Sequence, residues 1–372
     1  MTIAVHISFS GTNDDPSKNF NYRCCTILAE KYPGHHFIFI FDKPFSPLLI
    51  TQKNITAVLL SPQIKNRLLG YYWYNFKIPA LLNKYHADLF ISNGINSSIR
   101  TTVRQCLFLK DLSFLQKQNL FDRSDTWYLK KYFKKFIAKA ACIAVPNHAT
   151  SVVLAGHFPA AKGKTHVIGY GLPEAAHNIG YDKMQDTRNK YSGGKEFFVC
   201  YLTNASVANT TILLKAFSAF KKRQLSNMQL LLVLSPAQKK NSIKDFTTYK
   251  YRDEVKIISP ENEQLLIEIT VAAYAAIYLP EMEIMEGEGL LAIKNNIPLI
   301  TTSNEFCKSL YNDAALYAKI DEKNIAEKMM LLYKNENLRN DLGNIGKLVG
   351  SIYSWDNTAA NLWQALQEPV DQ

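Results

Sequence analysis

Cysteine is scarce in this sequence, and its spacing excludes several classes of site. Six cysteines occur among 372 residues; Cys24 and Cys25 are adjacent and the other four lie far apart, so the chain has no C-x-x-C pair. No disulfide framework at short spacing is therefore expected. Cysteines distributed in this way are typical of buried thiols in a reducing compartment.

Long hydrophobic runs are also missing. The longest apolar block, "LLLVL" at 230–234, is far below the ~20 residues that a membrane-spanning helix needs. The first residues, "MTIAVHISFSG", lack the basic start and the long apolar run of a signal peptide. We therefore expect a cytoplasmic protein; a basic helix described below adds an alternative, peripheral placement at the inner face of the membrane.

Several catalytic signatures are absent. The sequence has no G-x-S-x-G elbow of serine hydrolases, and its eight histidines show no metal-ligand spacing such as H-E-x-x-H. The peptide "GHFPAAKGKT" (156–165) ends like a phosphate-binding loop, but six residues separate its glycines where that pattern needs four. We expect no P-loop, no bound metal ion and no separate cofactor.

Positive charge is in excess. Lys and Arg number 43 against 32 Asp and Glu, which gives a formal net charge of +11 and a pI near 9.1. This balance favours phosphate-bearing ligands, nucleic acid or anionic lipid surfaces as partners.

A hydrophobic fraction of 47% with 20% charged residues is typical of a soluble globular protein, and the length suggests two domains.

Short apolar segments alternate with segments of helical spacing along the chain. Near-continuous apolar strands are typical of parallel sheets that are covered on both faces, so the alternation predicts an α/β protein. Strands are expected at 2–9, 36–41, 55–60, 88–92, 105–109, 142–146, 197–202, 228–234, 255–259, 275–279 and 298–302, and helices at 17–31, 127–141, 209–224, 261–273, 287–296 and 322–334.

Residues 169–195 interrupt this alternation. They contain glycine, proline and polar residues without an apolar stripe, which is typical of a linker between domains. The sequence therefore predicts two Rossmann-like, doubly wound parallel-sheet domains, at 1–175 and 190–350, that face each other across a cleft. Ligands of such sheets lie beyond the carboxyl ends of the strands.

Residues 127–141, "WYLKKYFKKFIAKAA", predict a basic and aromatic helix. One interpretation is a helix that covers a sheet and whose solvated side is basic; another is a patch that rests on anionic lipid headgroups. Nucleic acid is not expected, because no nucleic-acid-binding module accompanies the charge. Lys130, Lys131, Lys134, Lys135 and Lys139 fall on one helical face, and Tyr128, Leu129, Tyr132, Phe133, Phe136 and Ile137 lie toward the other.

Four glutamates crowd into nine positions, "EMEIMEGEG" at 281–289, between an expected strand and an expected helix. One interpretation is that they cap the helix and keep a loop in water. The other is a sugar site beside a phosphate. The segment "GEGLLA" (287–292) has the G-x-G-x-x-A form that often opens a helix against a phosphate, and ionised carboxylates accept hydrogen bonds from sugar hydroxyls.

With these motifs the chain resembles the retaining glycosyltransferases of family 4, whose GT-B fold consists of two Rossmann-like domains. The segment "YLPEMEIMEGEGLLAIKNNIPLITT" (278–302) follows the family's strand, its E-x7-E motif and the helix after it when Pro298 is the anchor. The segment 209–234 is similar to the family's K-N-x-x-x-L-L-x-A-F stretch, and the segment 87–115 to its D-x-x-x-S…H-D-L-x-F stretch.

Both ends of the chain add to the resemblance. Residues 11–41 stand where a Gly-rich loop follows the family's first strand. Residues 353–367, "YSWDNTAANLWQALQ", are similar to the family's closing helix. The resemblance therefore implies that 351–372 cross back to the first domain.

The resemblance implies a hexosyltransferase of polysaccharide biosynthesis that moves a sugar, with retention, from a nucleotide-sugar donor to a glycan or lipid-linked acceptor. The C-terminal domain would hold the donor, and the N-terminal domain would present the acceptor near Gly11, Lys110 and Asp111. The implied catalytic residues are Lys110, Asp111 and Glu283, and the implied donor-binding residues are Gly11, Asn204, Asn209, Glu283, Glu286, Gly287 and Glu288.

The chain departs from the family pattern where the chemistry should be. Val207 and Ala208 stand where a basic pair precedes the conserved asparagine, Lys110 replaces the histidine of the H-D motif, and Leu291 replaces the second glutamate. These replacements motivate a second hypothesis, a catalytically impaired GT-B protein that acts as a binding or partner subunit. A nucleotide-sugar epimerase of the same fold is a third, disfavoured because "LLKAF" (213–217) resembles transferases more closely.

The missing basic pair has a physical consequence. Without a divalent metal, a leaving nucleoside diphosphate must be stabilised by cations and helix N-termini, and loss of one such donor typically costs ~10²–10³ in rate. Lys110, Lys215 and Arg100 are the candidates to replace the missing bases.

Overall fold

The computed structural model describes ten stretches of the chain and divides it into two compact units. Unit 1 contains Met1–Gly171 and Ser354–Gln372, and unit 2 contains Leu172–Tyr353. The described residues are 1–8, 19–94, 96–109, 112, 115, 123–174, 179–203, 206–234, 248–280 and 287–368; the side chains at 93, 123–127 and 130 lie outside the description.

Unit 1 is built on a seven-stranded sheet with the order β3-β2-β1-β4-β5-β6-β7, in which every pair is parallel. The register places Val5 of the central strand beside Phe39 on one side and Ile91 on the other. The strands are β1 (Thr2–Ile7), β2 (His36–Phe41), β3 (Ile55–Leu59), β4 (Leu89–Asn93), β5 (Arg104–Phe108), β6 (Cys142–Val145) and β7 (Thr165–Val167).

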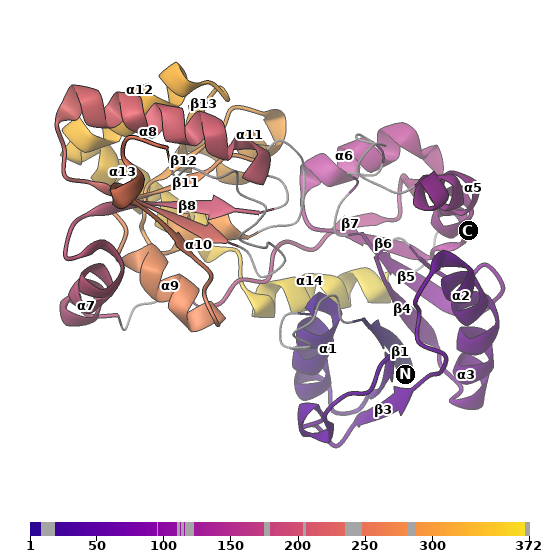
Figure 1. Cartoon of the computed structure of the whole chain (residues 1–372). Helices are drawn as coiled ribbons and strands as arrows, with labels where there is room; N and C mark the ends of the chain where they lie inside the picture. The colour runs from indigo at the N-terminus through magenta and orange to yellow at the C-terminus, as the bar shows by residue number, and fades with distance from the viewer. Residues whose placement is uncertain are drawn as a thin grey trace. The chain divides into compact units, whose positions relative to one another are not determined.

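Helices cover both faces of this sheet (Figure 1). One face carries α2 (Arg67–Tyr72), the π-helical turn η3 (Trp73–Lys77), α3 (Ile78–Lys84) and α5 (Arg123–Lys139), whose apolar sides pack on the strands. The other face carries α1 (Phe20–Lys31), which stacks the ring of Phe20 on Phe108 of β5 at 4.1 Å. The remaining elements are η2 (Pro47–Leu49), α6 (His148–His157) and η5 (Pro159–Ala161).

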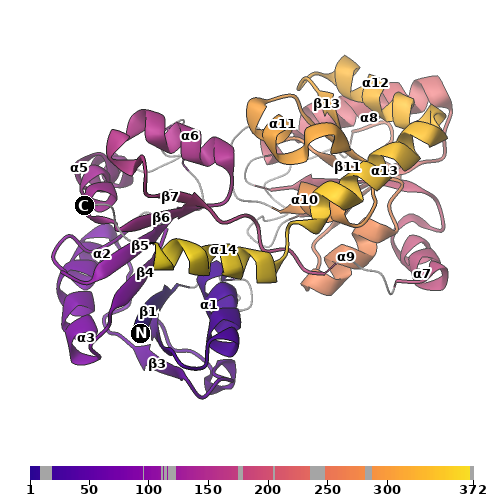
Figure 2. The same cartoon turned by 180° about the vertical axis from the view of Figure 1, so that it is seen from behind.

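The last helix of the chain, α14 (Trp355–Gln367), belongs to unit 1, where it lies along α1 (Figure 2). The ring of Trp363 stacks on Tyr32 with 4.2 Å between centroids. At the other end of the helix Trp355 packs so closely against Gly171 that a Cβ there would overlap the indole ring. Both places where the chain enters or leaves unit 1 are therefore packed within it.

Unit 2 is built on a six-stranded parallel sheet with the order β10-β9-β8-β11-β12-β13. The strands are β8 (Phe197–Leu202), β9 (Gln229–Leu234), β10 (Val255–Ile258), β11 (Ala275–Tyr278), β12 (Leu299–Thr302) and β13 (Ala315–Ala318). The helices are α7 (Tyr181–Ser192), η6 (Val207–Asn209), α8 (Thr210–Gln224), η8 (Arg252–Glu254), α9 (Glu263–Val271), α10 (Glu288–Lys294), α11 (Glu305–Tyr311), η9 (Asn312–Ala314), α12 (Glu322–Lys334) and α13 (Glu336–Ser351).

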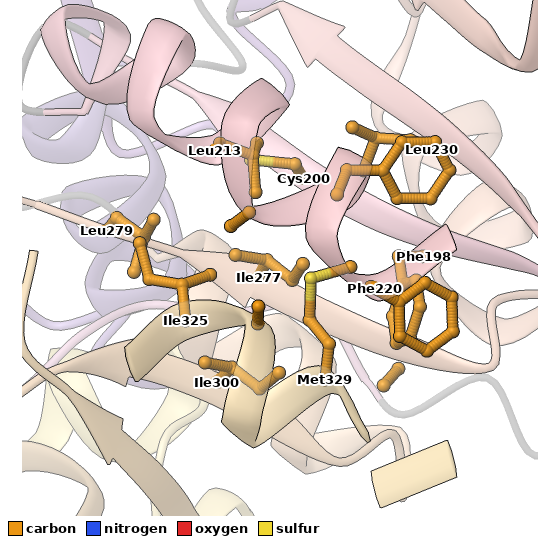
Figure 3. Close-up of a cluster of buried hydrophobic side chains, with 14 of the residues drawn as sticks. Phe198, Cys200, Leu213, Phe220, Leu230, Ile277, Leu279, Ile300, Ile325 and Met329 are labelled. Atoms are coloured by element: carbon orange, nitrogen blue, oxygen red, sulfur yellow. The ribbon is translucent and has the colours of Figure 1, made fainter. Parts of the chain in front are cut away.

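One face of the unit 2 sheet forms a hydrophobic core with α8 and α12 (Figure 3). The strands contribute Phe198, Leu230 and Ile277, and the helices contribute Phe220 and Met329, all fully or almost fully buried. Alternate residues of the same strands, such as Tyr201, face the other side, where Tyr201 meets Thr270 of α9. Burial of the strands on both sides explains their unbroken apolar sequences.

The predicted α/β class with two parallel-sheet, Rossmann-like units is confirmed, and every expected strand is present to within two residues at its ends. In the segment 156–165, the end of α6 is followed by η5 and then by β7. Gly163 lies in a turn with φ of 78° between η5 and β7, and the following Lys164 donates hydrogen bonds to carbonyls at the end of α5, including Ile137 and Ala140.

The prediction of a linker over 169–195 is wrong for part of this range. Residues Tyr181–Ser192 form α7, which ends at Gly193 in the left-handed region with φ of 64°. This helix has almost no apolar side chains to reveal it. It is held instead by polar contacts to its neighbours: Arg188 Nε donates to the Ala272 carbonyl at 2.9 Å, and Lys183 pairs with Glu268 at 3.4 Å.

A buried histidine lies where β1 ends. His6 is 2% exposed, its Nδ1 is 2.7 Å from the Tyr74 hydroxyl, and its ring lies 4.6 Å from that of Trp73. Nε2 has no hydrogen-bond partner among the described residues. Burial lowers the pKa of His6 to about 3, so the ring is neutral at pH 7.

Replacement of Gly289 by alanine should destabilise unit 2. A Cβ at Gly289 would overlap the hydroxyl of the fully buried Tyr311 and lie 3.2 Å from Leu299, so the core must shift at a cost of about 1–3 kcal/mol. Urea denaturation followed by circular dichroism measures the loss. The matched control is Gly156→Ala in α6, where a Cβ meets no atom within 4 Å. Equal stability of Gly289→Ala and the parent would contradict the packing.

His6 should make the stability of unit 1 depend on pH. Its pKa is lowered from 6.5 to about 3 by folding, so its contribution is complete above about pH 6.5 and is lost as the pH falls toward 3. His6→Asn should reduce the pH slope of the unfolding free energy by up to about 1.4 kcal/mol per pH unit in this window. The exposed His157→Asn serves as the control; an unchanged slope in His6→Asn would refute the assignment.

Candidate functional site

The strand order of unit 2 contains one point where the direction of winding reverses, between β8 and β11. From β8 the chain proceeds to β9 and β10 on one side, and then from β11 to β12 and β13 on the other. In open α/β sheets ligands bind at such a point, beyond the carboxyl ends of the strands. The described residues nearest to it are those that follow β8 and β11.

The corner after β8 is held by side-chain hydrogen bonds to the backbone. Ser206 Oγ accepts from the Thr203 amide at 3.0 Å and donates to the Tyr201 carbonyl at 2.9 Å. Asn209 Nδ2 donates to the carbonyl of Leu279, just beyond β11, at 2.9 Å. Asn209 therefore ties together the ends of the two strands that flank the reversal point, and it is 3% exposed.

Helix α8 begins directly after this corner. Asn209 is its N-cap residue, and its side chain makes no capping hydrogen bond among the described residues. The helices α9, α11, α12 and α13 of the same unit each have an asparagine or aspartate side chain that caps their first turn. The N–H of Thr210, the first residue of α8, donates to the Val207 carbonyl of the preceding turn, and the positive end of the dipole of this 15-residue helix lies at the corner.

The positions of the missing basic pair lie in this corner. Val207 is half-buried and Ala208 is exposed, both in the turn η6 that leads into α8. Of the candidate replacement cations, Lys215 pairs with Glu322 of α12 at 4.0 Å. In unit 1 the guanidinium of Arg100 lies 4.1 Å from the ring centre of Phe76.

Helix α10 follows β11 and carries the end of the glutamate cluster. Glu288 is in its first turn, is half-buried and has one buried carboxylate oxygen. Burial, and after it the nearby charge of Glu288, raises the pKa of the Tyr201 phenol, although the hydrogen bond to Thr270 at 2.8 Å acts in the opposite direction. Glu288, Tyr201 and Thr270 thus form a polar group at the reversal point.

The two glycines of "GEG" have packing roles. A Cβ at Gly287 would lie 2.8 Å from Leu172, and Gly289 abuts Tyr311 as described above. Leu291, at the position of the family's second glutamate, is 4% exposed and packs within the unit. Asn296 closes the helix in the left-handed region, with φ of 64°.

The far end of α10 is fixed to the chain segment that leaves unit 2. Lys294 Nζ donates to the Tyr353 carbonyl at 2.8 Å, and Gly350 packs against the backbone of Lys294. Burial lowers the pKa of Lys294, whereas the charge of Glu174 raises it. The helix that carries Glu288 is therefore held at both ends.

Unit 1 has a corresponding reversal point between β1 and β4. There Asn21 of α1 donates from Nδ2 to the carbonyls of His6 at 3.1 Å and Ser92 at 3.2 Å, so it bridges the ends of the two flanking strands. Asn21 is 1% exposed. In both units an asparagine at the start of the helix that follows the first strand donates to a carbonyl at the end of a strand beside the reversal point.

The site residues expected from the sequence are therefore only partly placed. Asn209, Gly287 and Glu288 belong to the reversal point of unit 2, as described. Gly11, Lys110, Asp111, Asn204, Glu283 and Glu286 lie outside the described residues, so their roles stay predictions.

Sequence reasoning missed Tyr201, Thr270 and Asn21. Tyr201 lies in an apolar strand and Thr270 in an apolar helix. The hydrophobic pattern of these segments does not distinguish a side chain that carries a hydroxyl group from its apolar neighbours. Asn21 follows Asn19, the N-cap residue of α1, and an asparagine near a helix start reads first as a cap. Its bridging role depends on a strand end 71 positions away.

No three His, Cys, Asp or Glu side chains of the described residues gather in a way that could hold a metal ion. Among the same residues, no helix combines the length and apolar character needed to pass through a bilayer. All six cysteines are buried thiols.

Residues 182–349 match the sequence model of the family "Glycosyl transferases group 1". This region comprises most of unit 2, including η6, α8 and α10. No curated protein gives a significant sequence match to the chain.

Three solved structures similar to this chain cover it almost completely. A glycosyltransferase from Rickettsia africae shares 12% identity with a TM-score of 0.71 and covers 99% of both chains. WaaG, a glycosyltransferase involved in lipopolysaccharide biosynthesis, shares 12% identity with a TM-score of 0.73, covering 99% of this chain and 100% of its own. HepE from Anabaena, in complex with UDP, shares 13% identity with a TM-score of 0.73, covering 98% and 99%. At this level of identity the likeness establishes the fold, which is the GT-B arrangement of two Rossmann-like domains.

Proposed function

We propose that the protein is a glycosyltransferase that moves a sugar from a nucleotide-sugar donor to a glycan or lipid-linked acceptor with retention of configuration. The observation that carries the proposal is the family match over residues 182–349. The match falls on unit 2, where the start of α8, which has no side-chain cap, and Glu288 of α10 lie at the reversal point. HepE, a protein of similar fold, has been solved with UDP and with UDP and glucose.

The donor diphosphate would lie at the start of α8. The dipole of this helix favours a phosphate group at its start, and Asn209 keeps the corner fixed to β11. Such a fixed dipole stabilises the negative charge that develops on a leaving diphosphate without reorganisation. This arrangement supplies part of the role that the basic pair has in the family pattern.

The hydroxylated end of the donor would lie at Glu288. The carboxylate of Glu288 is half-buried in the first turn of a helix, and a carboxylate can accept hydrogen bonds from ribose or sugar hydroxyls. In the family pattern a glutamate at the position of Leu291 performs this task. Glu288, one turn earlier, takes that place in this proposal, and Glu283 would contact the sugar as the resemblance implies.

Isothermal titration with nucleoside diphosphates and their sugars tests the proposal. Binding of at least one donor, together with its enzyme-dependent cleavage in the presence of a glycan or lipid-linked acceptor, is expected. Loss of cleavage in Glu283→Gln with retained folding would place that residue in catalysis. Absence of heat with every donor, in protein shown by circular dichroism to be folded, would reject the function. Binding without any cleavage would favour the alternative of a catalytically impaired binding subunit.

Glu288→Gln should weaken binding of the best nucleotide or nucleotide-sugar about tenfold. The substitution preserves shape but removes a charged acceptor, and a hydrogen bond to a charged group contributes about 1.5–3 kcal/mol. Titration calorimetry at fixed ionic strength measures the change. The matched control is Glu336→Gln, which alters an exposed first-turn glutamate of α13. An equal affinity of Glu288→Gln and the parent would remove Glu288 from the site.

A further inference from the structure

The positive charge of the protein is concentrated in unit 1. Unit 1 contains 21 Lys and Arg against 11 Asp and Glu, a formal net charge of +10, whereas unit 2 contains 22 against 21, a net charge of +1. Two long stretches of unit 1, residues 43–87 and 126–171, contain no acidic residue at all. The helices α2 and α3 and residues 126–139 of α5 lie within these stretches.

Helix α5 presents its lysines to solvent on one face. Residues 131, 134, 135, 138 and 139 are exposed, which follows the i, i+3, i+4, i+7 spacing of a single helical face. Four of these five are lysines. On the opposite face Leu129, Phe133 and Phe136 are buried against β5 and β6.

The neighbouring helix presents large apolar side chains to solvent. Leu68 is 81% exposed, and Tyr72 and Phe76 are each 42% exposed. They follow one another at intervals of four residues along α2 and the π-helical turn, and the rings of Tyr72 and Phe76 stack at 5.5 Å. Trp73 and Tyr74 point to the core, so Leu68, Tyr72 and Phe76 form an outward apolar stripe.

The apolar stripe and the basic face adjoin each other on the same side of the unit 1 sheet. Tyr71 of α2 contacts Tyr132 of α5 at 5.0 Å between ring centres, and the guanidinium of Arg67 lies 5.9 Å from the ring of Tyr128. Figures 1 and 2 show α2 next to α5 in both views. Arg100 adds a further cation, stacked over Phe76 at 4.1 Å.

We propose that the face formed by Leu68, Tyr72 and Phe76 together with Lys131, Lys134, Lys135 and Lys139 binds the surface of an anionic lipid bilayer. The lysines would lie among the negatively charged headgroups, and the apolar stripe would enter the boundary between headgroups and acyl chains. Both kinds of side chain are needed for stable attachment of a protein that does not span the membrane.

A bilayer fits this face better than nucleic acid does. Phosphates of nucleic acid would satisfy the lysines, but they offer no environment that favours burial of Leu68 and of the outer edge of Phe76. The interface of a bilayer accepts an aliphatic side chain, an aromatic ring with a polar tip such as Tyr72, and snorkelling lysines at the same depth. The inference concerns lipid binding alone and does not depend on the proposed transferase activity.

Co-sedimentation of the full chain with lipid vesicles tests the inference. Vesicles of phosphatidylcholine containing 30% phosphatidylglycerol should bind the protein, pure phosphatidylcholine vesicles should bind it much less, and 0.5 M NaCl should weaken the binding. Lys134→Gln/Lys135→Gln/Lys139→Gln should lower the partition coefficient about a hundredfold, since each lysine near such a surface contributes a factor of about five. Leu68→Ser/Phe76→Ser should lower it about tenfold or more.

Matched variants in unit 2 control for charge and for exposed apolar surface. Lys323→Gln/Lys334→Gln/Lys347→Gln removes three exposed lysines, and Leu348→Ser removes a side chain that is 73% exposed; both variants should bind vesicles as the parent does. Circular dichroism checks that each variant is folded.

Three results would overturn the inference. The first is equal binding to charged and neutral vesicles. The second is full binding by the Leu68→Ser/Phe76→Ser variant, which would leave only a general attraction of a basic protein. The third is binding to a 30-base-pair DNA duplex, lost in the lysine variant, without binding to vesicles.

Discussion

The fold depends on one constraint: a parallel β-sheet must be covered on both of its faces. Its strands have no solvated side, so side chains of both orientations must be apolar, and the connections between neighbouring strands must cross over the sheet. Both units satisfy this constraint. In unit 2, Ile277 lies in the core with α8 and α12, while Tyr201 of β8 faces α9 on the opposite side. Because the strands of each unit are parallel, their carboxyl ends all lie at one edge of the sheet. The reversal points, where polar side chains gather, lie at this edge.

Most of the strands could be predicted from the sequence, because strands that are buried on both faces have nearly continuous apolar sequences. The exceptions have physical causes. The strand β7 has only three residues and gives too little pattern, and β13 was not predicted either. Helix α7 was mistaken for a linker because Arg188 and Lys183 hold it by polar contacts instead of an apolar stripe. A pattern of hydrophobicity cannot reveal an element that is stabilised in this way.

The site was less predictable than the fold. The amide nitrogen of Asn209 bonds to the Leu279 carbonyl 70 positions away, and no local motif encodes this contact. Leu172 and Tyr311 lie where a Cβ at Gly287 and at Gly289 would point, and these neighbours are also distant in the sequence. Such roles depend on distant chain segments, and they become visible only when those segments are placed.

The return of α14 to unit 1 determines which parts of the chain can be separated. Unit 2 is a single continuous stretch, Leu172–Tyr353, whereas unit 1 is assembled from both ends of the chain. A fragment that stops at Gly171 would expose Tyr32 and the outer side of α1, which Trp363 and its helix otherwise shield from water. Only unit 2 can therefore be excised with one cut at each end, and unit 1 would need a new peptide connection between Gly171 and Ser354 to remain whole.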